Sequence, residues 1–216
     1  MSALFPDLST ILTFALASVV LIVTPGPDMA LQLSRTINYG RVHGVATALG
    51  SNLGILIHAG LVASGISMLI VAAPMAFLAL KLVGAIYLIW LAIQAILSRG
   101  GLKIAEAEGR RPRLIESVFA GIAINLLNPK VVLFFITFLP QFVSADDSAA
   151  SGKLFLLGGE FALIYLPCCL LLVLAAGGIA RALRTSHWLN RALNYGFAAV
   201  FTGFALMILK TQTRHA

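Results

Sequence analysis

The sequence predicts an all-α integral membrane protein. Of its 216 residues, 60% are hydrophobic and only 11% are charged, and the mean hydropathy is +0.98. Soluble domains carry roughly 25% charged residues, so this chain has too little polar surface to coat a water-soluble globule. Several apolar stretches also exceed the roughly 20 residues that a helix needs to cross a bilayer. Soluble enzymes, nucleic-acid binders and disulfide scaffolds are therefore excluded, and the lipid bilayer is an expected partner.

Six apolar segments give the order of the predicted spans. They cover approximately residues 8–34, 42–65, 69–97, 115–142, 154–180 and 190–210. Lipid cannot satisfy open backbone groups, and the segments lack the short alternating pattern of barrel strands, so all six are expected to be helices. The first segment lacks the positive flank of a signal peptide and is expected to be retained. We expect one transmembrane domain over residues 1–216.

Lys and Arg residues are distributed unevenly between the two sides of these spans. Ten fall in the connections after the first, third and fifth segments, five of them in a basic loop at about residues 98–113, and three fall on the other side. The positive-inside rule therefore predicts that this loop is cytoplasmic and that both termini lie outside. The net charge of +7 is accordingly interpreted as topology rather than as a polyanion site.

The basic loop divides the chain into two halves of three spans, at about residues 1–97 and 114–216. An odd number of spans in each half predicts opposite orientations, which is the layout of an inverted repeat. Matching interruptions support this interpretation, because Thr24 to Asp28 breaks the first segment and Asn125 to Lys130 breaks the fourth.

The prolines and glycine of these interruptions should open the two helices. Pro25, Gly26 and Pro27 lie in the first break and Pro129 in the second. Proline removes a backbone donor and clashes with the preceding turn. In transporters, the groups freed by such breaks line a substrate site between the repeats. The alternative is a purely structural kink.

Charged residues inside the predicted spans need a partner or a water-filled cavity, because each costs about 2.5 to 3.5 kcal/mol at the centre of a membrane helix. Asp28 and Lys130 follow the two breaks directly, so we expect them to contribute to binding or coupling. Lys81 and Glu160 lie at shallower depth, where a lysine can instead extend its ammonium to the interface.

Several uncharged polar residues in the spans have both a functional and a structural interpretation. Asn52, Asn125 and Asn128 could bind a zwitterion or join helices by hydrogen bonds, and His58 could carry a proton or pack within the bundle. The small-residue spacing of Gly50 and Gly54 permits close helix contact, either within the chain or along the seam of a homodimer.

No cofactor or metal is expected from the motifs. The sequence has no glycine-rich phosphate loop, no metal-spaced His and Cys cluster and no serine elbow. Adjacent Cys168 and Cys169 are poor candidates for an ordinary disulfide and are expected to be small buried residues.

Five motifs together resemble the LysE/RhtB amino-acid exporters, particularly the homoserine and threonine efflux branch. They are the Thr24 to Asp28 break, the 50–58 stretch, the Lys81 to Leu88 stretch, Asn128-Pro129-Lys130, and Leu139 to Phe142. The resemblance implies a bacterial inner-membrane exporter of small amino acids, driven by protons. It also implies functional roles at the motif residues Pro25, Gly26, Pro27, Asp28, Lys81, Asn128, Pro129 and Lys130. Glu160 and the two cysteines depart from the family pattern.

These observations predict a secondary transporter with alternating access and both termini periplasmic. Asp28 would hold the substrate amine or the coupling proton, Lys130 and Lys81 would favour its carboxylate, and Asn128 would orient it. The competing hypothesis is a passive channel or facilitator for small polar solutes, which would use the same helices without coupling.

Overall fold

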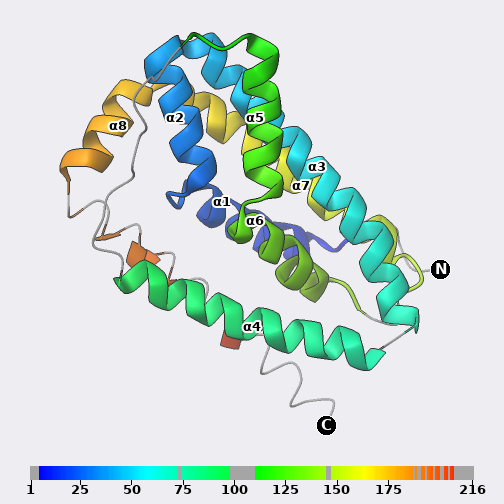
Figure 1. The fold of residues 1–216 in the computed structure, drawn as a ribbon. Coiled ribbons are helices and arrows are strands. Elements are labelled where there is room, and N and C mark those ends of the chain that lie inside the picture. The colour runs from blue at the N-terminus through cyan, green and yellow to red at the C-terminus, as the bar shows by residue number, and fades with distance from the viewer. Residues whose placement is uncertain are drawn as a thin grey trace.

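The computed structural model describes residues 5–72, 74–97, 110–144 and 147–186, with isolated residues between 188 and 206. All regular structure in these residues is helical (Figure 1). The elements are α1 Leu8–Val23, α2 Pro27–Tyr39, α3 Arg41–Ala72, α4 Pro74–Leu97, α5 Leu114–Leu126, α6 Pro129–Leu133, the π-helical stretch η1 Phe134–Phe138, the 3₁₀ turn η2 Leu139–Phe142, α7 Ala150–Leu174 and α8 Ala176–Thr185.

The all-α prediction is confirmed for this part of the chain. α3 over Arg41–Gly65 and α7 are each long and apolar enough to cross a membrane. The pair α1 and α2 and the pair α5 and Pro129–Phe142 also pass that test together, as bent spans. α4 matches the third predicted segment, whereas the sixth segment, 190–210, lies outside the continuously described residues. The arrangement as six spans in an inverted repeat stays a prediction.

Both predicted breaks are present at the expected residues. α1 and α2 meet at 54°, and α5 meets Pro129–Phe142 at 52°. The residues that precede the prolines, Thr24, Gly26 and Asn128, all have extended backbones. Proline disfavours the helical conformation in the residue before it, so the local sequence is sufficient to account for both bends.

Several segment boundaries differ from the prediction: α2 ends at Tyr39 rather than 34, α4 begins at Pro74 rather than 69, and α7 begins at Ala150 rather than 154. Two differences are larger. α3 continues seven residues beyond the expected end at 65, to Ala72, because the segment that follows has no proline before Pro74, where α4 begins. The fifth segment is divided at Ala175 into α7 and the short α8, whereas one helix to about residue 180 was expected. Hydropathy alone does not reveal either boundary.

Glycine contacts bring α3 and α5 together along the bundle. A Cβ atom on Gly121 would overlap the Thr47 carbonyl oxygen, and one on Gly50 would overlap the Val118 carbonyl. Ser51 Oγ donates to the Gly121 carbonyl oxygen at 3.3 Å across the same contact. The small-residue stripe of α3 therefore packs within the chain, as the intramolecular alternative predicts.

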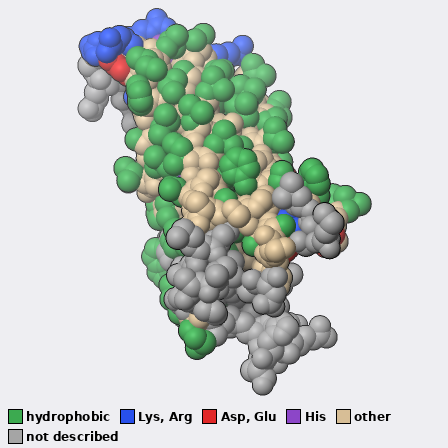
Figure 2. Space-filling view, turned by 90° about the vertical axis from the view of Figure 1, so that its right-hand side faces the viewer, with side chains coloured by type: hydrophobic (Ala, Val, Ile, Leu, Met, Phe, Trp, Pro, Cys, Tyr) green, Lys and Arg blue, Asp and Glu red, His purple; other side chains and the backbone are tan. Residues whose placement is uncertain are grey.

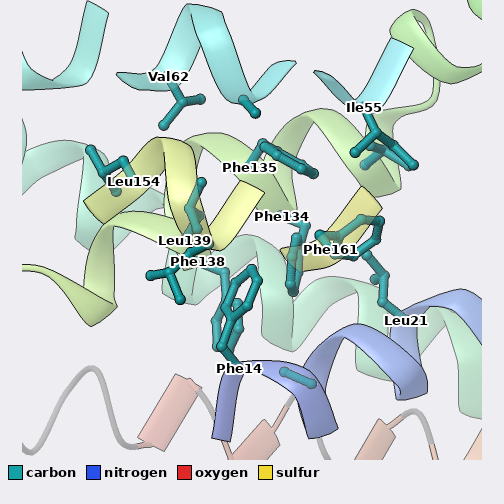
Figure 3. Close-up of a cluster of buried hydrophobic side chains, with 14 of the residues drawn as sticks. Phe14, Leu21, Ile55, Val62, Phe134, Phe135, Phe138, Leu139, Leu154 and Phe161 are labelled. Carbon is teal, nitrogen blue, oxygen red and sulfur yellow. The ribbon is translucent and has the colours of Figure 1, made fainter. Parts of the chain in front are cut away.

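Aromatic rings fill the centre of the bundle (Figure 3). Phe14 of α1, Phe134 and Phe138 of η1 and Phe161 of α7 are each at most 2% exposed. The ring centroids of Phe134 and Phe138 are 4.8 Å apart, and those of Phe134 and Phe161 are 5.4 Å apart. This cluster fixes the half of the bent span after the second break against α1 and α7.

The surface is that of a protein embedded in lipid. Figure 2 shows a flank covered mainly by hydrophobic side chains, with most of the visible Lys and Arg at one end. Arg111 Nη2 donates to the Tyr39 carbonyl oxygen, and Arg110 pairs with Glu116 in the first turn of α5. Exposed leucines such as Leu163 (77%) of α7 and Leu16 (64%) of α1 add to the apolar surface.

Candidate functional site

The two helix breaks meet in the interior of the bundle, where they exchange polar contacts. Asp28 lies in the first turn of α2, and its Oδ2 accepts a hydrogen bond from Asn128 Nδ2 at 2.8 Å and one from Asn125 Nδ2 at 3.3 Å. Asp28 is 7% exposed, and both asparagines are buried. The carboxylate of the first break is therefore held by the amides of the second.

Lys130 makes the reciprocal contact, from the second break to the first. Its Nζ donates to the carbonyl oxygens of Thr24 at 2.9 Å and Leu21 at 3.0 Å. Leu21 would normally bond the N–H four residues later, but that residue is Pro25, which has none. The ammonium thus occupies the negative end of the α1 dipole and satisfies a carbonyl that proline has freed.

The second break also contains a carbonyl oxygen that has lost its usual helical donor to a proline. Pro129 removes the usual helical donor for the Asn125 carbonyl oxygen, which instead accepts from the Asn128 backbone N–H at 3.1 Å and from His58 Nε2 of α3 at 3.5 Å. The Asn128 side chain accepts from the Lys130 backbone N–H at 3.1 Å and begins α6. His58 is buried against the Phe135 ring, so its contacts match the packing interpretation.

The absence of a side chain at Gly26 leaves space for the Lys130 ammonium. A Cβ at position 26 would lie 3.1 Å from Lys130 Nζ, closer than ordinary van der Waals contact. Asp28 and Lys130 themselves form no ion pair within the described part of the chain. Two opposite charges are therefore held near each other, each by neutral groups of the other break.

A cavity of about 540 Å³ opens beside this centre. Its polar lining consists of Thr24, Asp28, Gln32, Lys130 and Tyr165. The rest is apolar or thiol and comes from α1, α2, α6, α7 and α8, with Ile22, Met29, Val131, Phe161, Cys168, Leu172 and Ile179 among the lining residues. Such a cavity suits a small molecule with charged groups at one end and an apolar body at the other.

The structure does not bring Asn52 to this cavity. Asn52 faces a second cavity of about 650 Å³, which Glu160 also lines, on the other side of α7. Lys81 belongs to α4, and its side chain lies outside the described side chains. The described residues contain no cluster of three or more His, Cys, Asp and Glu side chains that could hold a metal ion.

Gln32 and Tyr165 line the cavity although the motifs did not indicate them. Gln32 Nε2 donates to Tyr165 Oη at 2.7 Å, and both side chains are buried. Gln32 follows Asp28 by four residues, so helical spacing alone would have placed both on one face. Tyr165 has no comparable local signal, because its contact with Gln32 spans 133 positions.

Two broken helices, a buried Asp28 and a half-buried Lys130 that are each held by the other break, and a cavity that is mostly apolar are typical of a membrane translocator. Residues 19–212 match the family model for LysE type translocators, and the chain belongs to this family.

Relatives of similar length share about three residues in ten with the chain. A leucine efflux protein of Klebsiella pneumoniae is 29% identical over 94% of the chain and 95% of its own length. A homoserine/homoserine lactone efflux protein of Salmonella typhimurium is also 29% identical, over 94% and 96%. A membrane protein of Vibrio cholerae is 31% identical over 63% and 66%. No solved structure matches the chain.

Proposed function

We propose that this protein is a proton-coupled secondary exporter of small amino acids across the bacterial inner membrane. The observation that carries the proposal is the reciprocal contact between the breaks, in which Asp28 is held by Asn125 and Asn128 while Lys130 is held by Leu21 and Thr24. Two opposite charges beside one cavity match an amino-acid zwitterion. The efflux proteins among the relatives, named for leucine and for homoserine and its lactone, support the same substrate class.

In this proposal, Asp28 receives the substrate ammonium and Lys130 its carboxylate. Lys130 has three N–H donors and uses two of them on carbonyl oxygens, so one remains for a substrate oxygen. The apolar walls, including Phe161, Leu172 and Ile179, suit a leucine-like side chain better than the hydroxyl of homoserine or threonine. We therefore expect aliphatic amino acids to be the preferred substrates.

In this proposal, the two breaks are also the hinges for alternating access between the inverted repeats. A carbonyl freed by proline can exchange one side-chain donor for another at low cost, because no helical hydrogen bond must be broken. If the substrate carboxylate draws Lys130 away from Leu21 and Thr24, α1 loses its anchor to the second break. Substrate binding would then change the angle at the first break.

Coupling to one proton is energetically sufficient for export. At 100 mV a proton supplies about 2.3 kcal/mol, which sustains a gradient of roughly fiftyfold for a neutral zwitterion. Asp28 is the carboxylate at the site and is the proposed proton carrier. The same cavity without coupling would make a passive facilitator, which is the alternative proposal.

The proposal is tested by loading cells with mixed dipeptides and measuring every released amino acid by mass spectrometry, with and without the protein. We expect selective release of a few aliphatic amino acids, abolished by a protonophore and by Asp28→Asn. An unchanged release profile, from protein shown to be correctly inserted, would overturn the proposal. Release that persists with the protonophore would favour the facilitator.

A further inference from the structure

α2 presents two buried oxygen acceptors to the cavity that have no partner. Asp28 and Gln32 lie one helical turn apart, line the same cavity, and are 7% and 1% exposed. Asp28 Oδ1 and Gln32 Oε1 have no hydrogen-bond partner among the described residues. Buried polar atoms are normally satisfied, so an adjacent pair of unsatisfied acceptors indicates a donor that binds from the cavity.

The opposite atoms of both groups are fixed by the protein. Asp28 Oδ2 accepts from the two asparagines of the second break, and Gln32 Nε2 donates to Tyr165 Oη at 2.7 Å. Tyr165 is 5% exposed and is held on α7. The protein therefore fixes the direction of the two free oxygens before a ligand binds, which is the arrangement of a preorganised binding site.

The chemistry of the missing donor follows from the charge and spacing of the acceptors. Residues four apart on a helix have Cβ atoms about 5 to 6 Å apart, a separation that one tetrahedral ammonium can bridge. One acceptor is a carboxylate, so a cation is favoured over a neutral donor. Lys130 directs two of its three N–H donors to carbonyl oxygens of the first break and forms no ion pair with Asp28 among the described residues, so it does not supply this donor.

We propose that Asp28 Oδ1 and Gln32 Oε1 form a subsite for the primary α-ammonium group of the transported substrate, with Tyr165 as a positioning residue that orients Gln32. This inference rests on the proposed function and adds a requirement to it. A substrate must offer at least two N–H donors in the right directions. An N,N-dimethyl amino acid keeps the positive charge but offers only one N–H donor, and a 2-hydroxy acid has no ammonium at all.

The test is counterflow of L-leucine, or of whichever amino acid the wild type exchanges fastest, in proteoliposomes, with its N,N-dimethyl derivative as competitor. We expect the wild type to bind the N,N-dimethyl compound about tenfold more weakly than the unmodified amino acid. Gln32→Leu, or the equally long Gln32→Met if the first variant does not fold, should raise KM about tenfold and lose this discrimination. Gln32→Glu keeps an oxygen acceptor at this position and should retain the discrimination. Ile37→Leu, on the lipid-exposed side of α2, is the matched control.

The positioning role of Tyr165 has its own measurement. Tyr165→Phe should raise KM in the wild-type background and have no further effect in Gln32→Leu. Additive effects of the two substitutions would overturn that role. Unchanged KM and unchanged discrimination against the N,N-dimethyl compound in both apolar Gln32 variants would overturn the subsite, while exchange by the wild type would leave the proposed function standing. Absence of exchange with any of the twenty amino acids would overturn both.

Discussion

Replacing Lys130 by methionine should abolish transport while leaving a folded protein. The substitution keeps an unbranched side chain, shorter by one atom, but removes the hydrogen bonds to Leu21 and Thr24 at 3.0 and 2.9 Å. Hydrogen bonds of a charged group contribute about 1.5 to 3 kcal/mol each, so about 3 to 6 kcal/mol is lost. Removing an ammonium from a membrane span returns about 2.5 to 3.5 kcal/mol. The free energy of unfolding should therefore fall by about 3.5 kcal/mol at most.

The assay pairs two measurements on the same purified Lys130→Met protein. Circular dichroism during titration with a denaturing detergent gives the free energy of unfolding, and proteoliposome flux gives the transport rate. Lys130→Arg, which keeps the charge, should retain more activity than the methionine variant. Wild-type flux in Lys130→Met would refute the assigned role of the ammonium, and loss of the folded state would refute the balance of energies.

Two glycine substitutions test the close contacts, each against a glycine whose added Cβ meets no described atom within 4 Å. Gly26→Ala should lower the transport rate severalfold, because its Cβ would lie 3.1 Å from Lys130 Nζ, whereas Gly159→Ala should leave the rate unchanged in the same flux assay. Gly121→Ala should lower the free energy of unfolding by about 2 kcal/mol or more, because overpacking forces the helices apart. Gly60→Ala should not lower it, and equal destabilisation by both would contradict the assigned contact.

The features that the sequence predicts correctly are those with a local physical cause. Proline and glycine chemistry is sufficient to position both breaks, and hydropathy is sufficient to find the apolar helices. The cost of an intramembrane charge identifies Asp28 and Lys130 as residues that need partners. The partners themselves were not predicted, because the Asp28–Asn128 contact joins positions 100 residues apart.

Features set by tertiary packing were missed or left open. Gln32 and Tyr165 satisfy each other only because α2 and α7 are adjacent, and no local pattern in the sequence reveals that adjacency. Asn52 is a polar residue in an apolar span, as a site residue would be, but it lines the second cavity together with Glu160. Hydropathy separates helices from loops, but it does not specify which face of a helix meets the cavity.

Energy coupling at this site is the property that separates the proposed exporter from a facilitator. Proteoliposomes containing the purified protein and equal L-leucine on both sides would be given an imposed proton gradient. We expect leucine to move uphill, against the direction of proton flow, until its concentrations on the two sides differ severalfold. This leucine gradient should collapse when a protonophore is added. Equal concentrations that persist under the proton gradient, together with rapid passive exchange, would contradict the proposed coupling and identify a facilitator.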